Sequence, residues 1–133
     1  MEKIFPEPEF VERKYPNAYR IIGEDVKALS DLQDKFLKIS EQIKDGKFPS
    51  FTELGHDAFR TGYKLGTIEE SLWIAHRKKA ITHSDLGDLV FIHFDVDKVL
   101  PMLDKVGEEL NNMLIEKLAK NVGKEKARAI LGW

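Results

Sequence analysis

The sequence predicts an all-α protein, an antiparallel four- or five-helix bundle preceded by an extended N-terminal arm. Three observations support this prediction. Apolar residues recur at helical spacing over two long stretches. Capping sequences and glycines separate the helical stretches, and no clear pair of strands occurs. A chain of 133 residues fits one domain, which we place at residues 17–133, after an arm at residues 1–16.

The arm is expected to be extended because prolines interrupt it. Pro6, Pro8 and Pro16 each lack a backbone N–H and restrict the residue before them. The terminal segments also contain aromatic side chains that a bundle core need not bury. Exposed aromatic groups often mark interfaces, so these residues predict contacts with a second copy: Phe5, Phe10, Tyr15 and Trp133.

Two long amphipathic helices are expected to frame the bundle. The first begins near Asn17 and ends at Asp45-Gly46, because glycine accepts the left-handed conformation that follows many helices. The second begins near Asp97, tolerates Pro101 in its first turn, and is interrupted by Gly123. Residues 124–131 can then add a short terminal helix. The apolar stripes consist of Ile22, Val26, Leu29, Leu32, Phe36, Ile39 and Ile43, and of Val99, Met102, Leu103, Val106, Leu110 and Met113.

The middle of the chain contains two capping boxes, Ser50 to Glu53 and Thr67 to Glu70. They predict helices over about 50–65, ended by Gly66, and over about 67–81. The following stretch, Leu86 to Val96, is short, apolar and partly β-branched, so it fits a strand or a buried helical turn equally well. Since no second clear strand could pair with it, we favour a short helix or an ordered connection.

Composition excludes several classes of protein. The chain has 21 Lys plus Arg against 23 Asp plus Glu, a formal charge of −2, so any site for a polyanion must be a local patch. The absence of cysteine excludes a disulfide framework, a thiolate zinc site and a cysteine nucleophile. No apolar run is long enough to span a membrane, and the first residues do not form a signal peptide. We therefore expect a cytoplasmic protein without a membrane partner.

Metal-binding and nucleotide-binding motifs are not evident. His56-Asp57 resembles part of a paired His-Asp metal motif, but no histidine precedes it. Asp95 and Asp97 fit the capping of the second long helix better than metal binding. No glycine-rich phosphate loop and no nucleophile elbow occurs. We expect no metal and no cofactor, and a carboxylate–histidine metal bundle is the least favoured alternative.

The strongest chemical signal lies between His76 and Asp85. Arg77 can bind a phosphate with two parallel N–H bonds, and the ordinary pKa of histidine allows His83 to exchange protons near neutral pH. Lys78 and Lys79 can bind RNA or phosphate, and Asp85 can orient the imidazole. In a regular helix Arg77 and His83 would be about 120° apart around the axis and about 9 Å apart along it. The two side chains can therefore cooperate only if the helix ends before His83, or if they act across a subunit boundary.

These residues resemble the HEPN superfamily of small helical proteins, many of which are RNases of toxin–antitoxin and antiphage systems. Its mark is an arginine followed a few positions later by histidine, here Arg77 and His83. The similarity is closer to abortive-infection-type HEPN proteins, with the pattern Arg-Asn-Lys-x-x-Ala-His-x-Asp, which Arg77, Lys79, His83 and Asp85 match. Lys78 and Thr82 depart from it. The resemblance covers roughly residues 70–120.

The resemblance implies a metal-independent endoribonuclease that acts as a homodimer, with Arg77 and His83 as catalytic residues and an antitoxin or other protein as a further partner. Lys78 in the usual asparagine position favours an alternative, a non-catalytic helical module that binds RNA, a nucleotide or a protein. A third interpretation needs no ligand. Cations in the last turn of a helix, from Arg77 to Lys79, and a histidine near that end interact favourably with the helix dipole.

Overall fold

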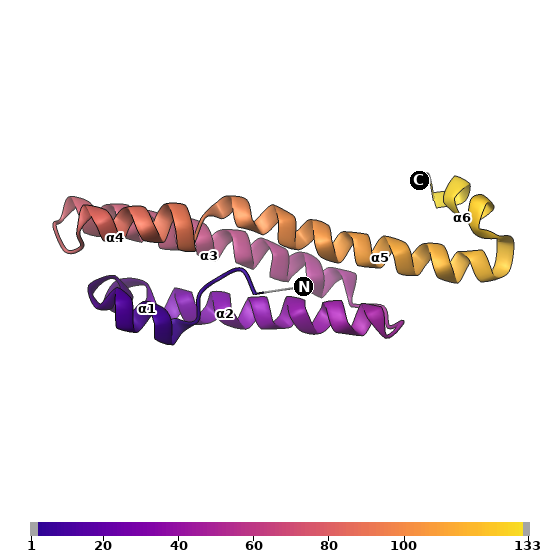
Figure 1. The fold of residues 1–133 in the computed structure, drawn as a ribbon, viewed down its shortest axis with the longest axis horizontal. Coiled ribbons are helices and arrows are strands. Elements are labelled where there is room, and N and C mark those ends of the chain that lie inside the picture. Colours follow the sequence, from indigo (N-terminus) through magenta and orange to yellow (C-terminus); the bar gives the residue numbers. More distant parts are fainter. Residues whose placement is uncertain (1–2, 132–133) are drawn as a thin grey trace.

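Three long helices lie along one axis in the computed structural model, which describes residues 3–131 (Figure 1). They are α2 (Pro16–Lys44), α3 (Phe51–Arg77) and α5 (Val99–Val122), and α3 runs antiparallel to the other two. The short helices α1 (Pro8–Lys14) and α4 (His83–Asp88) lie at one end, and α6 (Lys124–Leu131) lies at the other. The described residues include no strand, which confirms the predicted all-α bundle.

The N-terminal arm is not extended throughout, so that part of the prediction is wrong. Residues 8–14 form α1, with Pro8 in its first turn, and Pro16 occupies the first turn of α2. A proline at these positions loses no helical hydrogen bond and already has a helical φ. The segment before α1 is fastened by Gln33 of α2, whose side-chain oxygen accepts the N–H groups of Ile4 and Phe5 at 2.6 and 2.8 Å.

The two middle helices that the capping boxes predict are one continuous helix, α3, and this prediction is also wrong. Ser50 does cap it, since its hydroxyl accepts the N–H of Glu53 at 3.3 Å. Gly66 lies inside the helix, because the buried neighbours Leu65 and Ile68 hold the backbone on both sides of it. The hydroxyl of Thr67 donates to the carbonyl oxygen of Tyr63 at 3.0 Å, a bond made inside a helix and not at its start.

The ambiguous apolar stretch is helical. It contains the end of α4 and a π-helical turn, η1 (Leu89–His93), and then a 3₁₀ turn, η2 (Val96–Lys98), leads into α5. The carboxylate of Asp95 accepts the N–H of Asp97 at 3.0 Å and so caps η2. The N-cap residue of α5 is Lys98, without a side-chain cap, so the predicted capping of the long helix by Asp95 and Asp97 is wrong. Gly123 adopts φ 84° between α5 and α6, as expected for the glycine that separates them.

The apolar core consists of two clusters along the bundle. The larger cluster joins α1, the first half of α2, the second half of α3, α4 and η1. The smaller one joins the second half of α2 to α5, around Phe36, Met102 and Val106. Ile4 and Leu103 pack against both clusters. Phe5 and Tyr15 belong to the larger cluster and are buried, so they do not provide the exposed interface expected of them, whereas Trp133 lies outside the described residues.

Candidate functional site

Arg77 is the last residue of α3, and His83 is the first residue of α4. The helix therefore ends before His83, which meets the condition under which the two side chains can act together within one chain. Both are exposed, as are Lys78 and Lys79 between them. No hydrogen bond or ion pair joins Arg77 to His83 among the residues that the structure describes, so both side chains are open to a ligand.

The turn after α3 has a defined hydrogen-bond pattern. The N–H of Lys79 donates to the carbonyl oxygen of His76 at 3.0 Å, and the N–H of Ala80 donates to that of Ala75 at 2.9 Å. This pair of bonds is a Schellman motif, in which the residue after the C-cap is left-handed and usually glycine. Lys79 fills that position with φ 62°. A cation with a long side chain is thus held in a backbone conformation that disfavours it.

The start of α4 fixes the other side of the turn. The hydroxyl of Thr82 accepts the N–H of Asp85 at 3.1 Å, an N-cap that places His83 in the first turn. Ile81 is buried in the larger core cluster and anchors the loop. Asp85 is half-buried, and no hydrogen bond or ion pair joins its carboxylate to His83 within the described chain.

His76 joins the site, although the sequence did not single it out. Its ring centroid lies 5.3 Å from that of His83, and Trp73 meets His76 edge to face at 6.4 Å. Trp73 is 40 % exposed, so it belongs to the surface and not to the apolar face of α3. The sequence places His76 directly before Arg77, which could have marked it as a site residue. The periodicity of the sequence does not reveal the turn that brings His76 close to His83. The indole of Trp73 and the imidazoles of His76 and His83 are therefore in a row, and the exposed cations Arg77, Lys78 and Lys79 belong to the same turn.

A half-buried polar cluster joins α4 and η1 to the start of α2. The hydroxyl of Tyr15 donates to Asp88 at 3.1 Å and lies 3.2 Å from Nε2 of His93. Burial, and then the hydrogen bond to Asp88, raise the pKa of Tyr15 to about 12. Burial, with Lys14 and Lys98 nearby, lowers the pKa of His93. The cluster thus holds a neutral phenol and favours a neutral imidazole.

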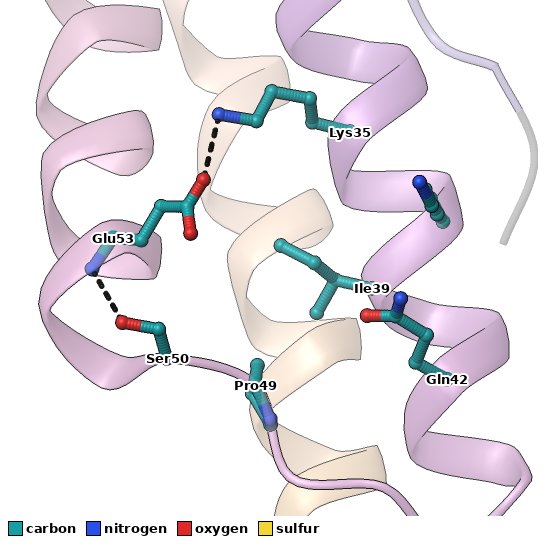
Figure 2. Close-up of a pocket in the computed structure, with 7 residues that line it drawn as sticks. Lys35, Ile39, Gln42, Pro49, Ser50 and Glu53 are labelled. Carbon is teal, nitrogen blue, oxygen red and sulfur yellow. Dashed lines mark hydrogen bonds and ion pairs between the residues drawn. The ribbon is translucent and has the colours of Figure 1, made fainter.

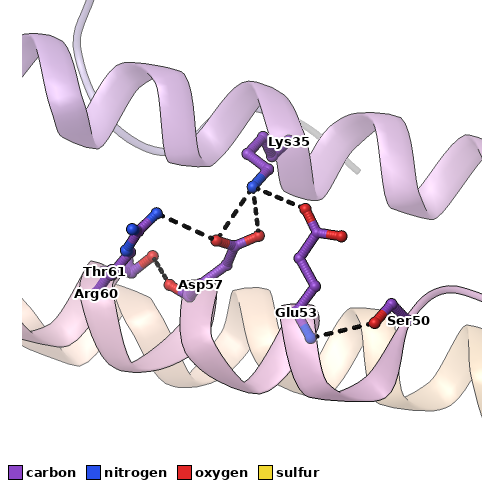
Figure 3. A network of polar contacts seen from close by, with 6 residues as sticks. All are labelled: Lys35, Ser50, Glu53, Asp57, Arg60 and Thr61. Carbon is purple, nitrogen blue, oxygen red and sulfur yellow. Dashed lines mark hydrogen bonds and ion pairs between the residues drawn. The ribbon is translucent and has the colours of Figure 1, made fainter.

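A second polar network lies between α2 and α3 (Figure 3). The Lys35 ammonium is 3.0 Å from one carboxylate oxygen of Asp57 and 3.2 Å from the other, and it also lies 3.2 Å from Glu53. The Asp57 side chain is only 2 % exposed. Hydrogen bonds to Asp57 and Glu53 raise the pKa of Lys35, so the ammonium remains charged. Within the His56-Asp57 pair, Asp57 therefore serves as an anchor between α2 and α3.

A pocket of about 260 Å³ lies next to this network (Figure 2). Ile39 and Gln42 of α2 line one side, and Pro49 and Ser50 line the entry to α3. The pocket is at the beginning of α3, whereas Arg77 ends the same 27-residue helix, a separation of about 40 Å. The pocket and the Arg77 turn are therefore separate features. Unlike the turn, the pocket has no histidine among the described residues that line it.

Within the described chain, no group of three or more His, Cys, Asp or Glu side chains is arranged to hold a metal ion. None of the described helices is long and apolar enough to cross a membrane. Comparison of the chain with protein-family models, with curated proteins and with solved structures gives no significant match.

Proposed function

We propose that the protein is a metal-independent endoribonuclease of HEPN type whose site is the turn from His76 to His83. The observation that carries the proposal is the approach of the two imidazole rings to 5.3 Å beside Arg77. Two imidazoles close enough to contact one phosphate can serve as general base and general acid. Arg77 can neutralise the charge that develops on the phosphate oxygens.

The chemistry requires no metal and no water in its first step. One imidazole, His83 in our proposal, accepts the proton of the ribose 2′-OH while the 2′ oxygen attacks phosphorus. The bond to the 5′ oxygen breaks, and the second imidazole, His76, supplies the proton that this oxygen takes. The products are a 2′,3′-cyclic phosphate and a 5′-hydroxyl. Lys78 and Lys79 bind neighbouring phosphates.

The test is cleavage of labelled RNA in EDTA by the full chain. We expect products that end in a cyclic phosphate, and Arg77→Ala, His83→Ala and His76→Ala should each lower the rate at least ~100-fold while the far-ultraviolet circular dichroism stays unchanged. His56→Ala is the matched control, because His56 is an exposed histidine on the first half of the same helix. The proposal is wrong if the parent leaves varied RNAs intact, or if the three variants cleave as it does.

Binding without cleavage is the second candidate function. The exposed Trp73 indole beside His76 can stack on a base, and the cations can hold the backbone of a single strand. Under this alternative, RNA binds without being cut, the affinity falls as salt rises, and charge-removing variants reduce the salt dependence. The resemblance further suggests a homodimer and a protein partner such as an antitoxin, which we include in the proposal as expectations.

A further inference from the structure

We propose that a second pocket, between the end of α2 and the middle of α5, binds an aliphatic diamine or polyamine. The pocket has a volume of about 250 Å³. Its lining includes two carboxylates, an amide, a lysine and two apolar side chains: Glu109, Glu116, Asn112, Lys44, Ile43 and Met113. It lies where α2 ends, whereas the Arg77 turn lies at the other end of the α2–α3 pair (Figure 1). The proposal therefore does not depend on RNA cleavage, and a failure of either leaves the other testable.

The carboxylate of Glu109 has one oxygen to spare for a ligand. Its side chain is only 10 % exposed, and the buried hydroxyl of Ser40 donates to Oε2 at 2.5 Å. Oε1 is buried and has no hydrogen-bond partner among the described residues. The nearest cation, the Lys44 ammonium, lies 4.0 Å from Oε1, which is beyond hydrogen-bond distance. A buried acceptor without a partner is costly, so this oxygen favours a ligand that brings an N–H donor.

The surroundings of the pocket favour a positively charged ligand. Glu109 and Glu116 both line it, whereas Lys44 is the cation of its lining. Lys44 is also the last residue of α2, so the negative end of the dipole of a 29-residue helix adjoins the pocket. The neighbouring cation Lys117 lies over the ring of Phe48, 4.4 Å from its centroid. The pocket therefore combines a helix C-terminus with an excess of carboxylates, which suits an ammonium group.

The spacing of the two carboxylates favours a ligand with two ammonium groups. Glu109 and Glu116 are seven residues apart on α5, which places them on the same side of the helix and about 10 Å apart along its axis. With a hydrogen bond of about 2.8 Å to each carboxylate, about 5 Å remains between two ammonium nitrogens, a distance that a short methylene chain spans. The buried side chains of Met113 and Ile43 also line the pocket and provide apolar contacts for that chain.

Lys44 is the group that the ligand replaces. Its ammonium lies 3.8 Å from Glu41 and 4.0 Å from Glu109, and its side chain is 50 % exposed. Exposed ion pairs of this length contribute little to stability. The ligand ammonium therefore takes the place of the Lys44 ammonium beside Oε1 of Glu109, and the displaced lysine side chain moves into solvent.

Isothermal titration of the full chain with butane-1,4-diamine at pH 7 tests the proposal. We expect one molecule per chain, with a dissociation constant below about 1 mM. Butan-1-amine has one ammonium and should bind about tenfold more weakly, because it loses one charge-assisted hydrogen bond. Butane-1,4-diol has the same chain without charge and should not bind. A protein that binds no diamine at concentrations up to about 10 mM overturns the proposal, and so does equal affinity for the diol.

Glutamine variants locate the two ends of the ligand. Glu109→Gln should weaken binding of the diamine and of the monoamine by about tenfold or more. Glu116→Gln changes an exposed residue, so it tests the site without disturbing a buried contact. It should reduce the affinity for the diamine to that for the monoamine, and leave the affinity for the monoamine unchanged.

Two further variants separate the pocket from general electrostatic attraction. Glu108→Gln is the matched control, because Glu108 is an exposed glutamate of the same helix that does not line the pocket. It removes the same charge as Glu116→Gln and should change the affinity by less than about twofold. Lys44→Met removes the competing ammonium and should tighten binding of the diamine. Equal losses in Glu108→Gln and Glu116→Gln overturn the proposal, as does weaker binding in Lys44→Met.

Discussion

Arg77 closes α3 and His83 opens α4, so the two side chains belong to different helices joined by a turn of five residues. On an unbroken helix they would be about 120° apart around the axis. The left-handed backbone of Lys79 ends the first helix, and the Thr82 hydroxyl starts the next. The relative placement of the proposed catalytic groups therefore depends on this turn, and its geometry leads to the first prediction.

Lys79→Gly should stabilise the protein. Glycine adopts φ 62° without the Cβ clash that lysine suffers, so we expect the free energy of unfolding to rise by about 0.5 to 1 kcal/mol in urea denaturation. Lys78→Gly is the control, because Lys78 has an ordinary φ of −84° and should gain nothing. Equal effects at both positions would contradict the strained turn. RNA binding should weaken in both variants, because each loses a cation.

Tyr15→Phe should destabilise the protein by about 1 to 2 kcal/mol, because it removes the buried hydroxyl that contacts Asp88 and His93. Equilibrium unfolding measures the loss. Tyr19→Phe is the matched control, since Tyr19 is half-buried on the next turn and its hydroxyl forms no hydrogen bond within the described chain. Similar losses in the two variants would show that the Tyr15 hydroxyl has no special role.

His93 should make stability depend on pH. Its folded-state pKa is lowered by burial and by Lys14 and Lys98, while Asp88 opposes the shift. Below the ordinary histidine pKa of about 6.5, the unfolded chain therefore binds a proton more readily than the folded chain. The contribution of His93 is complete above about pH 6.5 and falls as the pH decreases through the folded-state value.

Urea denaturation of the parent and of His93→Gln at pH 7.5 and pH 5.5 isolates this contribution. The parent should lose more stability between the two pH values than the variant does, because carboxylates affect both proteins alike. The same pH dependence in both proteins would contradict the lowered pKa of His93.

Lys35→Met should destabilise the protein, because it leaves the buried Asp57 carboxylate without its ammonium partner. Lys38→Met is the control, since Lys38 is an exposed lysine one turn further along α2. Chemical denaturation should show a clear loss for the first variant and little change for the second. The double variant Lys35→Met, Asp57→Leu should recover most of the loss. If it does not, Asp57 has another role in the fold.

The long helices could be predicted from sequence because their apolar spacing repeats over many turns. The stripe from Ile22 to Ile43 defines α2, and the pattern from Val99 to Met113 defines α5. Local sequence signals gave wrong helix boundaries where tertiary packing determines where a helix begins or ends. Gly66 is a residue typical of a helix end, but it lies inside α3 between buried neighbours. Pro8 is a residue typical of a helix interruption, but it begins α1.

The candidate site was predictable only in its residue types. Arg77, Lys79 and His83 stand out by spacing and charge, and the break between the helices was anticipated as a condition. The approach of His76 to His83 was not anticipated, because it depends on the left-handed backbone of Lys79. Sequence patterns assign that conformation to glycine or asparagine. The Tyr15 cluster joins residues 73 and 78 positions apart, a separation beyond the reach of local patterns.

The division of the core into two clusters implies a gradient of amide hydrogen exchange along the bundle. The larger cluster surrounds the end that bears the Arg77 turn, while fewer buried side chains hold α5 to the second half of α2. Segments with fewer buried contacts open at lower free energy. Amides of the second half of α5 should therefore exchange sooner than those around Leu72 and Leu86. The Arg77 turn is then attached to the slowest-exchanging part of the molecule, where its geometry is already set before any ligand arrives.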